Sequence, residues 1–295
     1  FAPTAQQVQL QLRQPDLSID MQKASDGSWS AQVQGDCDQR HYRFLAQGDE
    51  TGFGTPVIDP YARCVTGHRG WGIVLADSKP LPPGPAFPLS DAIIYELHLR
   101  DFTLDPDSLI QRRGKYLGLA EPKRHLFGDP AISTGLDHLV ELGINTVQIM
   151  PLCEFQNDEE QDAYGWGYDS VHFNSPEGWY SSRRHDSSRV QEFKQMVEAL
   201  HQRGIRVVMD MVYNHTMEDR FAGQIYSFEG LLPGYYYRRK PDGSYFNGSG
   251  VGNEFRSEAP MARRFLIDSC RYWVEHMGVD GFRFDLMGLV DAATL

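Results

Sequence analysis

An arginine and an aspartate lie two residues apart near the end of an apolar segment of this sequence. Arg283 and Asp285 belong to the segment 281–286, whose composition is typical of a β-strand. Residues two apart on a strand face the same side, so we expect the guanidinium to contact the carboxylate and to keep it ionised at neutral pH. An oriented, ionised carboxylate is what a retaining glycosidase uses as its nucleophile. The alternative is a buried ion pair with a purely structural role.

A second polar group closes the apolar segment 205–212. Asp210 lies within it, and Asn214 and His215 follow it directly. If these segments are neighbouring strands of one sheet, their carboxyl ends bring both polar groups to the same edge. Alternatively, Asn214 and His215 cap the following loop through their side-chain acceptors.

Aromatic rings alternate with glycines at residues 164–169, which read YGWGYD. Sugar rings bind flat aromatic faces through their C–H edges, so Tyr168 and the adjacent Asp169 are candidates for a polysaccharide site. The ring of Tyr168 could also pack the loop, and the two roles are compatible. Trp29 and Trp71 are further candidates for starch binding, although buried tryptophans are common in β-sandwich cores.

Apolar strand segments alternate with amphipathic helical segments after residue 91. The predicted strands are 92–99, 146–150, 205–212 and 281–286, and the predicted helices lie near 135–142, 189–202 and 259–276. Such alternation predicts a parallel sheet with right-handed crossovers. The connections from strand to helix are long and those from helix to strand are short, which favours a (β/α)₈ TIM barrel with its site on the long-loop face. About the first four strand–helix units fit in this sequence, and a doubly wound sheet is the alternative.

The sequence before residue 92 has a different pattern. Residues 1–80 contain short segments of period two, such as 8–12, 28–33 and 41–45, separated by turn residues, which predicts an all-β, immunoglobulin-like sandwich. Residues 81–91 form a proline-rich linker, because proline removes hydrogen-bond donors and fixes φ. We therefore expect a β-sandwich module at 1–80 and the N-terminal half of a barrel domain at 92–295.

Composition excludes several classes of protein. The formal net charge of -12 would repel a phosphate backbone, so we expect no nucleic acid partner. No apolar run approaches the roughly 20 residues that span a bilayer, so we expect a soluble protein, cytoplasmic or secreted. The four cysteines form no C-x-x-C pair, and we interpret Cys153 and Cys270 as buried thiols.

Several of these segments resemble the α-amylase family, glycoside hydrolase family thirteen. Residues 209–216 (MDMVYNHT) look like its first signature block, and residues 281–288 (GFRFDLMG) look like its second, in the form typical of type I pullulanases. The residues before the linker are similar to the starch-binding-type module of carbohydrate-binding family forty-eight. Supporting segments are YELHLRDF at 95–102, YGWGYD at 164–169, PEG at 176–178, NGSGVGNE at 247–254 and DPYA at 59–62. Gly165 and Ser170 depart from the Asn and Pro that are usual there.

The resemblance implies specific roles for these residues. Asp285 would attack the anomeric carbon and Arg283 would position it, while His215 would bond sugar hydroxyls and Tyr168 would stack on the cleaved ring. The remaining implied site residues would shape the loops around the substrate, with Met287 toward the acceptor side: Asp169, Asp210, Asn214 and Met287. The implied substrate is a branched α-glucan, cleaved at α-1,6 linkages in pullulan, starch or glycogen dextrins.

The family's general acid and its transition-state-stabilising Asp would lie beyond Leu295. We therefore expect this chain to need the C-terminal half of the barrel as its partner, and to be inactive alone. The alternatives are an isoamylase, a branching enzyme, a trehalose-releasing hydrolase or a non-catalytic glucan-binding fragment. We expect no organic cofactor and predict no metal site, although family analogy makes calcium near Asn214 an open alternative.

Overall fold

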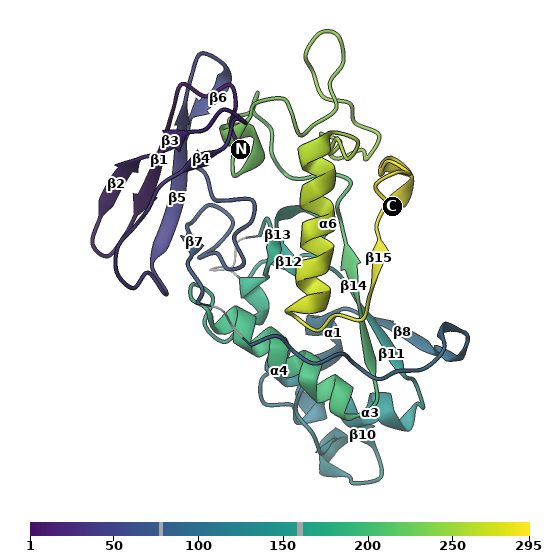
Figure 1. The fold of residues 1–295 in the computed structure, drawn as a ribbon. Coiled ribbons are helices and arrows are strands. Elements are labelled where there is room, and N and C mark those ends of the chain that lie inside the picture. Colours follow the sequence, from purple (N-terminus) through teal and green to yellow (C-terminus); the bar gives the residue numbers. More distant parts are fainter. Residues whose placement is uncertain (77–78, 158–161) are drawn as a thin grey trace.

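Four parallel strands form the central sheet of this protein. The computed structural model describes residues 1–76, 79–157 and 162–295. The strands are β8 (Ile94–Leu97), β11 (Thr146–Ile149), β14 (Arg206–Met211) and β15 (Gly281–Phe284), and they lie in the order β15-β14-β11-β8 (Figure 1). Each strand falls inside a predicted strand segment. The pairing of β14 with β15 places Asp210 opposite Arg283, so both polar groups meet at one end of the sheet.

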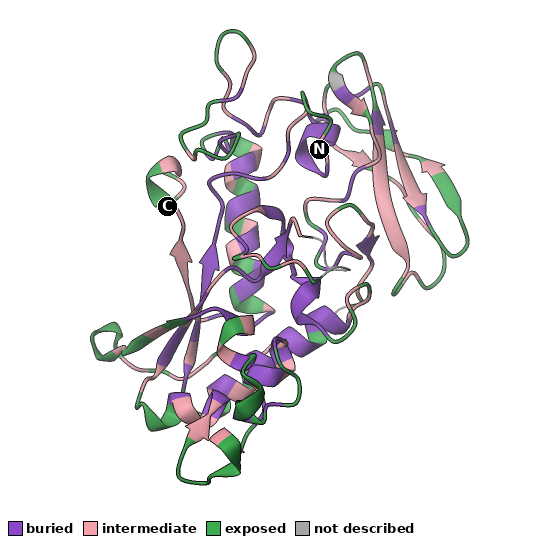
Figure 2. Cartoon of the chain, turned by 180° about the vertical axis from the view of Figure 1, so that it is seen from behind, coloured by how far each residue is buried: buried purple, intermediate pink, exposed green. Residues whose placement is uncertain are grey.

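Helices connect and cover these strands. The three main helices are α3 (Gly135–Glu141), α4 (Ser188–Gln202) and α6 (Pro260–Glu275), at the predicted places. Buried apolar side chains of α4 and α6, such as Phe193 and Trp273, pack with sheet residues in one core, and Figure 2 shows the buried faces of these helices. Gly204 and Gly278 follow α4 and α6 with positive φ angles, as expected after helix C-termini.

Short helical turns and two short strands lie before, between and after these main elements. The helical turns are η1 (Leu89–Asp91), α1 (Leu99–Thr103), η2 (Pro106–Ser108), α2 (Tyr116–Leu119), η3 (Leu126–Gly128), η5 (Gly178–Tyr180), α5 (Phe228–Leu231) and η6 (Met287–Leu289). The small strands β9 (Arg124–His125) and β10 (Ser133–Thr134) pair antiparallel.

An antiparallel pair of strands inside the connection after β11 was not predicted. It consists of β12 (Cys153–Phe155) and β13 (Ser170–Pro176), and every residue of both strands is buried. Polar side chains on β13 have hydrogen-bond partners: the Ser269 hydroxyl donates to Asn174 at 2.5 Å, and the ring of His172 contacts the carbonyl of His68 at 3.0 Å. Residues 170–174 (SVHFN) alternate polar with apolar side chains, which is a strand signal that the sequence analysis did not use, although both faces of the strand are buried.

The N-terminal region contains a four-stranded antiparallel sheet in the order β2-β1-β5-β7. Its strands are β1 (Gln7–Leu12), β2 (Leu17–Asp20), β5 (His41–Gln47) and β7 (Gly72–Ile73), and β3 (Gln22–Lys23) pairs with β4 (Trp29–Ser30) beside β6 (Thr51–Gly54). The predicted strands at 8–12 and 41–45 are present, whereas the segment 28–33 contributes only the two residues of β4.

Residues of the N-terminal region pack against α5 and α6. Val57 and Ala46 share a small apolar cluster with Leu231 of α5, and Tyr61 donates its hydroxyl to Asp268 of α6 at 3.1 Å. The predicted linker is bound to the parallel sheet, because Arg206 of β14 donates to the carbonyls of Pro85 and Phe87, both at 2.7 Å.

The two tryptophans of the N-terminal region are only partly buried. The guanidiniums of Arg13 and Arg43 lie 4.5 and 4.0 Å from the Trp71 ring centre. Trp29 donates its indole N–H to the carbonyl of Ala2 at 2.8 Å. Arginine therefore already contacts the Trp71 ring where a sugar would have to stack.

The cysteine predictions are half confirmed. Cys153 is 2% exposed, as predicted for a buried thiol. The prediction is wrong for Cys270, which is only partly buried because it lines a cavity of about 250 Å³ between α6 and β15. Among the described residues, no helix combines the length and the hydropathy needed to cross a bilayer.

Candidate active site

Arg283 and Asp285 make the contact that their spacing predicted. Arg283 Nη1 donates to Asp285 Oδ1 at 2.8 Å and to both carboxylate oxygens of Asp210, at 3.0 and 3.1 Å. One guanidinium nitrogen therefore joins the carboxylates of two adjacent strands. The Asp285 side chain is 16% exposed and the Arg283 side chain 41% exposed, so both remain accessible from solvent.

Asn214 contacts Asp285 from the other side. Its amide nitrogen donates to the backbone carbonyl of Asp285 at 3.0 Å and to Oδ2 at 3.1 Å. The Asp285 backbone N–H in turn donates to the carbonyl of Met211 at 3.0 Å. Both carboxylate oxygens thus accept a hydrogen bond, from Arg283 and from Asn214, and the side chain is held in one orientation.

His215 continues this chain of hydrogen bonds. Its Nδ1 lies 2.6 Å from Asn214 Oδ1, an acceptor, so the network assigns the proton to Nδ1. The side chain is 3% exposed, and Nε2 has no hydrogen-bond partner among the described residues. Burial lowers the pKa of His215, which favours the neutral ring. A buried ring nitrogen with a free lone pair is therefore available as an acceptor for a hydroxyl group.

Tyr168 reaches the same cluster from the loop after β11. Its hydroxyl donates to Asp210 Oδ2 at 2.8 Å. Burial raises the pKa of Asp210, and the bonds from Tyr168 and Arg283 oppose that shift. Burial and the bond to Asp210 both raise the pKa of Tyr168, so the phenol keeps its proton. Asp210 therefore holds Tyr168 and Arg283 in place.

Two predicted site residues lie outside this network. Among the described residues, the Asp169 carboxyl makes no hydrogen bond to the cluster, and it lines a separate cavity of about 720 Å³ with residues that include Arg69 and Tyr164. Burial raises the pKa of Asp169. Met287 is 54% exposed at the start of η6, two residues after Asp285. The structure thus brings together six of the eight predicted residues: Tyr168, Asp210, Asn214, His215, Arg283 and Asp285.

Exposed aromatic side chains lie on the loop that carries Tyr168. Tyr164 is 52% exposed and Trp166 is 61% exposed. The Trp166 indole donates to the Tyr164 hydroxyl at 3.1 Å, which donates to Asp101 at 2.6 Å. The two rings are therefore fixed relative to each other although solvent reaches them.

Sequence reasoning missed the residues that hold the loop after β14. Asn253 donates its amide to the carbonyls of Thr216 and Glu218, both at 2.8 Å. Arg238 contacts the carboxylates of Glu254 and Glu258 at 3.3 and 2.8 Å. The stretch 247–254 was a signal for such a role, but only the resemblance singled it out.

Among residues 1–76, 79–157 and 162–295, no three His, Cys, Asp or Glu side chains cluster in a way that could hold a metal ion. Near Asn214, the side-chain amide is already engaged by Asp285 and His215. Among the described residues, no group of acidic or other ligating side chains near Asn214 could hold a calcium ion.

A parallel sheet with acidic, amide and arginine side chains at its carboxyl ends is characteristic of enzymes of the TIM-barrel type. The family described as the α-amylase catalytic domain matches residues 124–294. This chain belongs to the α-amylase family.

Individual relatives agree with this assignment. The chain is 39% identical to a pullulanase of Bacillus subtilis strain 168 over its whole length, and 38% identical to chloroplastic isoamylase 1 of Oryza sativa subsp. japonica over 79% of its length. It covers 41% of the first protein and 31% of the second, so it spans less than half of either relative.

Solved structures give the same result. A pullulanase from Anoxybacillus sp. LM18-11, complexed with maltotetraose, superposes on the whole chain with a TM-score of 0.90 and 38% identity. The pullulanase from Bacillus acidopullulyticus does so with a TM-score of 0.87 and 39% identity. The chain covers 44% and 37% of these two proteins, respectively.

Proposed function

We propose that this chain is the nucleophile-bearing part of an α-glucan-debranching glycoside hydrolase that cleaves α-1,6 linkages. The observation that carries the proposal is the hydrogen-bonding of Asp285. Arg283 and Asn214 donate to its two oxygens at 2.8 and 3.1 Å. A carboxylate held this way is oriented for attack on an anomeric carbon, as a retaining mechanism requires.

The surrounding groups suit a glucose ring at this carboxylate. His215 Nε2 would accept a hydroxyl proton, since Nδ1 carries the ring's own proton toward Asn214. Tyr168, fixed through Asp210, would offer its ring face to the sugar. Asp169 and Met287, which lie apart from the network, would contact more distant parts of a branched glucan.

A retaining mechanism also needs a second carboxyl group about 5 to 5.5 Å from the first, to protonate the leaving oxygen. Among the described residues, Glu254 and Glu258 are committed to Arg238, and Asp210 is committed to Arg283 and Tyr168. We place the general acid on a later strand of a (β/α)₈ barrel whose first four strands are β8, β11, β14 and β15. The C-terminal half of that barrel would then be the partner of this chain.

The N-terminal residues fit a separate module in this proposal. Residues 1–80 would form a β-sandwich of carbohydrate-binding type, 81–91 a linker and 92–295 the half-barrel. Support comes from the antiparallel sheet of β1, β2, β5 and β7 and from the change to parallel pairing after the linker.

The test is reducing-sugar release from pullulan by this chain and by a form extended through the rest of its reading frame. Each is compared with Asp285→Asn and with Asp242→Asn, a control in an exposed turn. We expect release by the extended form, loss with Asp285→Asn and no change with Asp242→Asn. Absence of release by the extended wild type would exclude pullulan cleavage.

A further candidate is glucan binding without hydrolysis by this chain alone, because the carboxylates of Asp210, Glu254 and Glu258 are each engaged by an arginine. Calorimetric titration with maltotetraose tests it. Binding without reducing-sugar release supports that role, and release by the unextended chain contradicts it. Isoamylase-type specificity is separated by comparing pullulan with glycogen as substrates of the extended form.

A further inference from the structure

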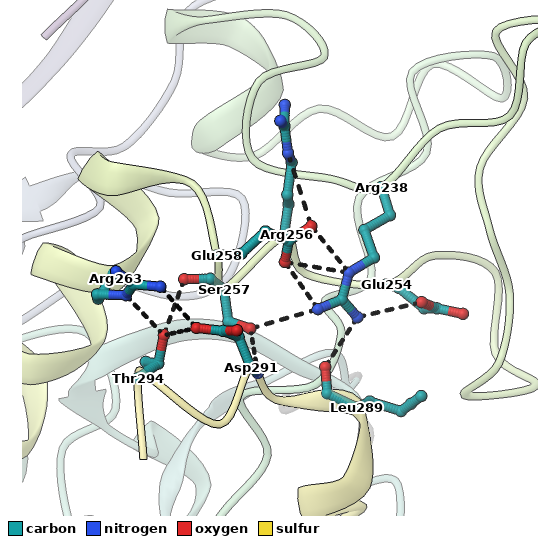
Figure 3. Close-up of polar contacts among 9 residues, drawn as sticks. All are labelled: Arg238, Glu254, Arg256, Ser257, Glu258, Arg263, Leu289, Asp291 and Thr294. Atoms are coloured by element: carbon teal, nitrogen blue, oxygen red, sulfur yellow. Dashed lines mark hydrogen bonds and ion pairs between the residues drawn. The ribbon is translucent and has the colours of Figure 1, made fainter.

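Arg238 joins two segments that the sequence keeps far apart. It lies in the long connection between β14 and α6, and its Nη1 donates to the carbonyl of Leu289 at 2.8 Å, in the turn that follows β15 (Figure 3). The same guanidinium contacts Glu258 through Nη2 at 2.8 Å and Glu254 through Nη1 at 3.3 Å. Both carboxylates orient the guanidinium, which then presents Nη1 to the turn.

The turn in question directly follows Asp285. Leu286 has a φ of 44° in the left-handed region, and η6 (Met287–Leu289) follows it. A non-glycine residue in that region costs free energy and persists where its surroundings hold it. Leu286 and Met287 are 48% and 54% exposed, so their own packing holds the turn weakly.

Polar contacts from neighbouring segments supply the constraint. Arg238 bonds the carbonyl of Leu289, and the Ser257 hydroxyl accepts from the backbone N–H of Asp291 at 2.8 Å. Arg263 contacts the Asp291 carboxylate at 2.6 Å (Figure 3). Of these three contacts, the bond from Arg238 is made at Leu289, which is closest in sequence to Met287. A charge-assisted hydrogen bond to a carbonyl is also stronger than a neutral one.

We propose that Arg238 is a positioning residue: by tying the Leu289 carbonyl to the loop after β14, it holds the turn 286–289 that follows Asp285, and so places Met287 where it contacts bound glucan. The identity of the ligand rests on the proposed function. The effect of Arg238 on the turn does not, because it can be measured in the protein without ligand. Arg238 acts through the turn and touches no substrate.

The first experiment measures the turn without any glucan. The methyl group of Met287 is labelled with ¹³C, assigned with Met287→Leu, and its order is measured by relaxation in wild type, Arg238→Met and Arg256→Met. Arg256 is the matched control, because its Nε lies 3.8 Å from Oε1 of the same Glu258 and, among the described residues, its side chain has no polar contact with the turn. We expect lower order of the Met287 methyl in Arg238→Met and an unchanged order in Arg256→Met.

The second experiment measures maltotetraose affinity by calorimetry for wild type, Arg238→Met, Met287→Ala and the double variant. We expect Arg238→Met to weaken binding about tenfold and to have little further effect once Met287 is shortened, because residues that act through one another are not additive. Arg238→Lys keeps the charge without the planar fork and should restore part of the affinity. It also replaces Arg238→Met if that variant does not fold.

The outcomes are distinguishable. Unchanged Met287 order in Arg238→Met, or additive losses in the double variant, would overturn the positioning role. A wild-type chain that binds no maltotetraose would overturn the glucan contact of Met287 even if the methyl loses its order, whereas the debranching assignment is decided by reducing-sugar release from the extended form.

Discussion

Asn214 donates one side-chain amide group both to the backbone carbonyl of Asp285, at 3.0 Å, and to its carboxylate, at 3.1 Å. The amide thereby fixes the side chain relative to its own backbone, while Arg283 holds the second oxygen. The two residues are on the connections after adjacent strands, so the orientation of the nucleophile depends on the pairing of β14 with β15.

This arrangement predicts the effect of replacing Asn214. In the extended form, Asn214→Asp keeps the shape but removes the donor and adds a negative charge beside Asp285. We expect the rate of pullulan cleavage to fall on the order of 10²-fold, as when one preorganised donor is removed from an active site. Initial rates measure the effect, and a thermal melt checks that the variant folds. Wild-type activity in Asn214→Asp would show that the amide does not orient the carboxylate.

Tyr168 allows the hydroxyl and the ring to be tested separately. Tyr168→Phe removes the bond to buried Asp210 but keeps the ring. We expect a loss of about 1 kcal/mol in the free energy of unfolding, because Asp210 loses one partner but keeps Arg283. Urea denaturation measures this loss. Maltotetraose affinity should survive Tyr168→Phe and fall with Tyr168→Ala, and equal affinities in the two variants would exclude stacking on the ring.

A buried carboxyl pair after β14 predicts a pH dependence of stability. Burial, and then the charge of Glu218, raises the pKa of Glu229 to about 7 from 4.5, while Arg239 at 3.3 Å and Arg220 oppose the shift. Between those pH values the folded chain keeps a proton that the unfolded chain has lost. The contribution of Glu229 to stability therefore falls as the pH rises from 4.5 to 7, by up to about 3 kcal/mol.

Glu229→Gln mimics the protonated side chain and should remove that slope. Urea melts of wild type and Glu229→Gln at pH 5 and pH 8 measure it, with the exposed Glu198→Gln as control. We expect Glu229→Gln to gain stability relative to wild type at pH 8 but not at pH 5. The same difference at both pH values would show that Glu229 does not titrate in this range.

The ion pair of Arg189 and Glu154 predicts a large loss of stability. Both side chains are fully buried and in direct contact, and Arg189 also donates to the carbonyl of Pro176 at 3.1 Å. Arg189→Met should cost about 3 to 5 kcal/mol, because it leaves a buried carboxylate without its main partner. Arg183, 74% exposed beside Asp186, is the control, and Arg183→Met should change stability by less than about 1 kcal/mol. Similar denaturation midpoints for both variants would contradict this reasoning.

Local patterns in the sequence determined the main elements of the barrel-type sheet. Strand and helix periodicities extend over a few residues and depend on side-chain direction, so β14, β15, α4 and α6 could be predicted at the observed places. The contact between Arg283 and Asp285 follows from the same period of two.

Contacts between distant segments were decided only by the tertiary structure. The bond from Asn214 to Asp285 needs the order and register of two strands. The bond from Arg238 to Leu289 needs the long connection after β14 to reach the turn after β15, 51 residues further along the sequence. Strand β13 alternates polar and apolar residues over 170–174, but only the folded structure shows that both of its faces are buried. The sequence by itself determined which residues could do chemistry, while packing of the whole chain decided which of them meet, because register and loop path depend on contacts that no local pattern contains.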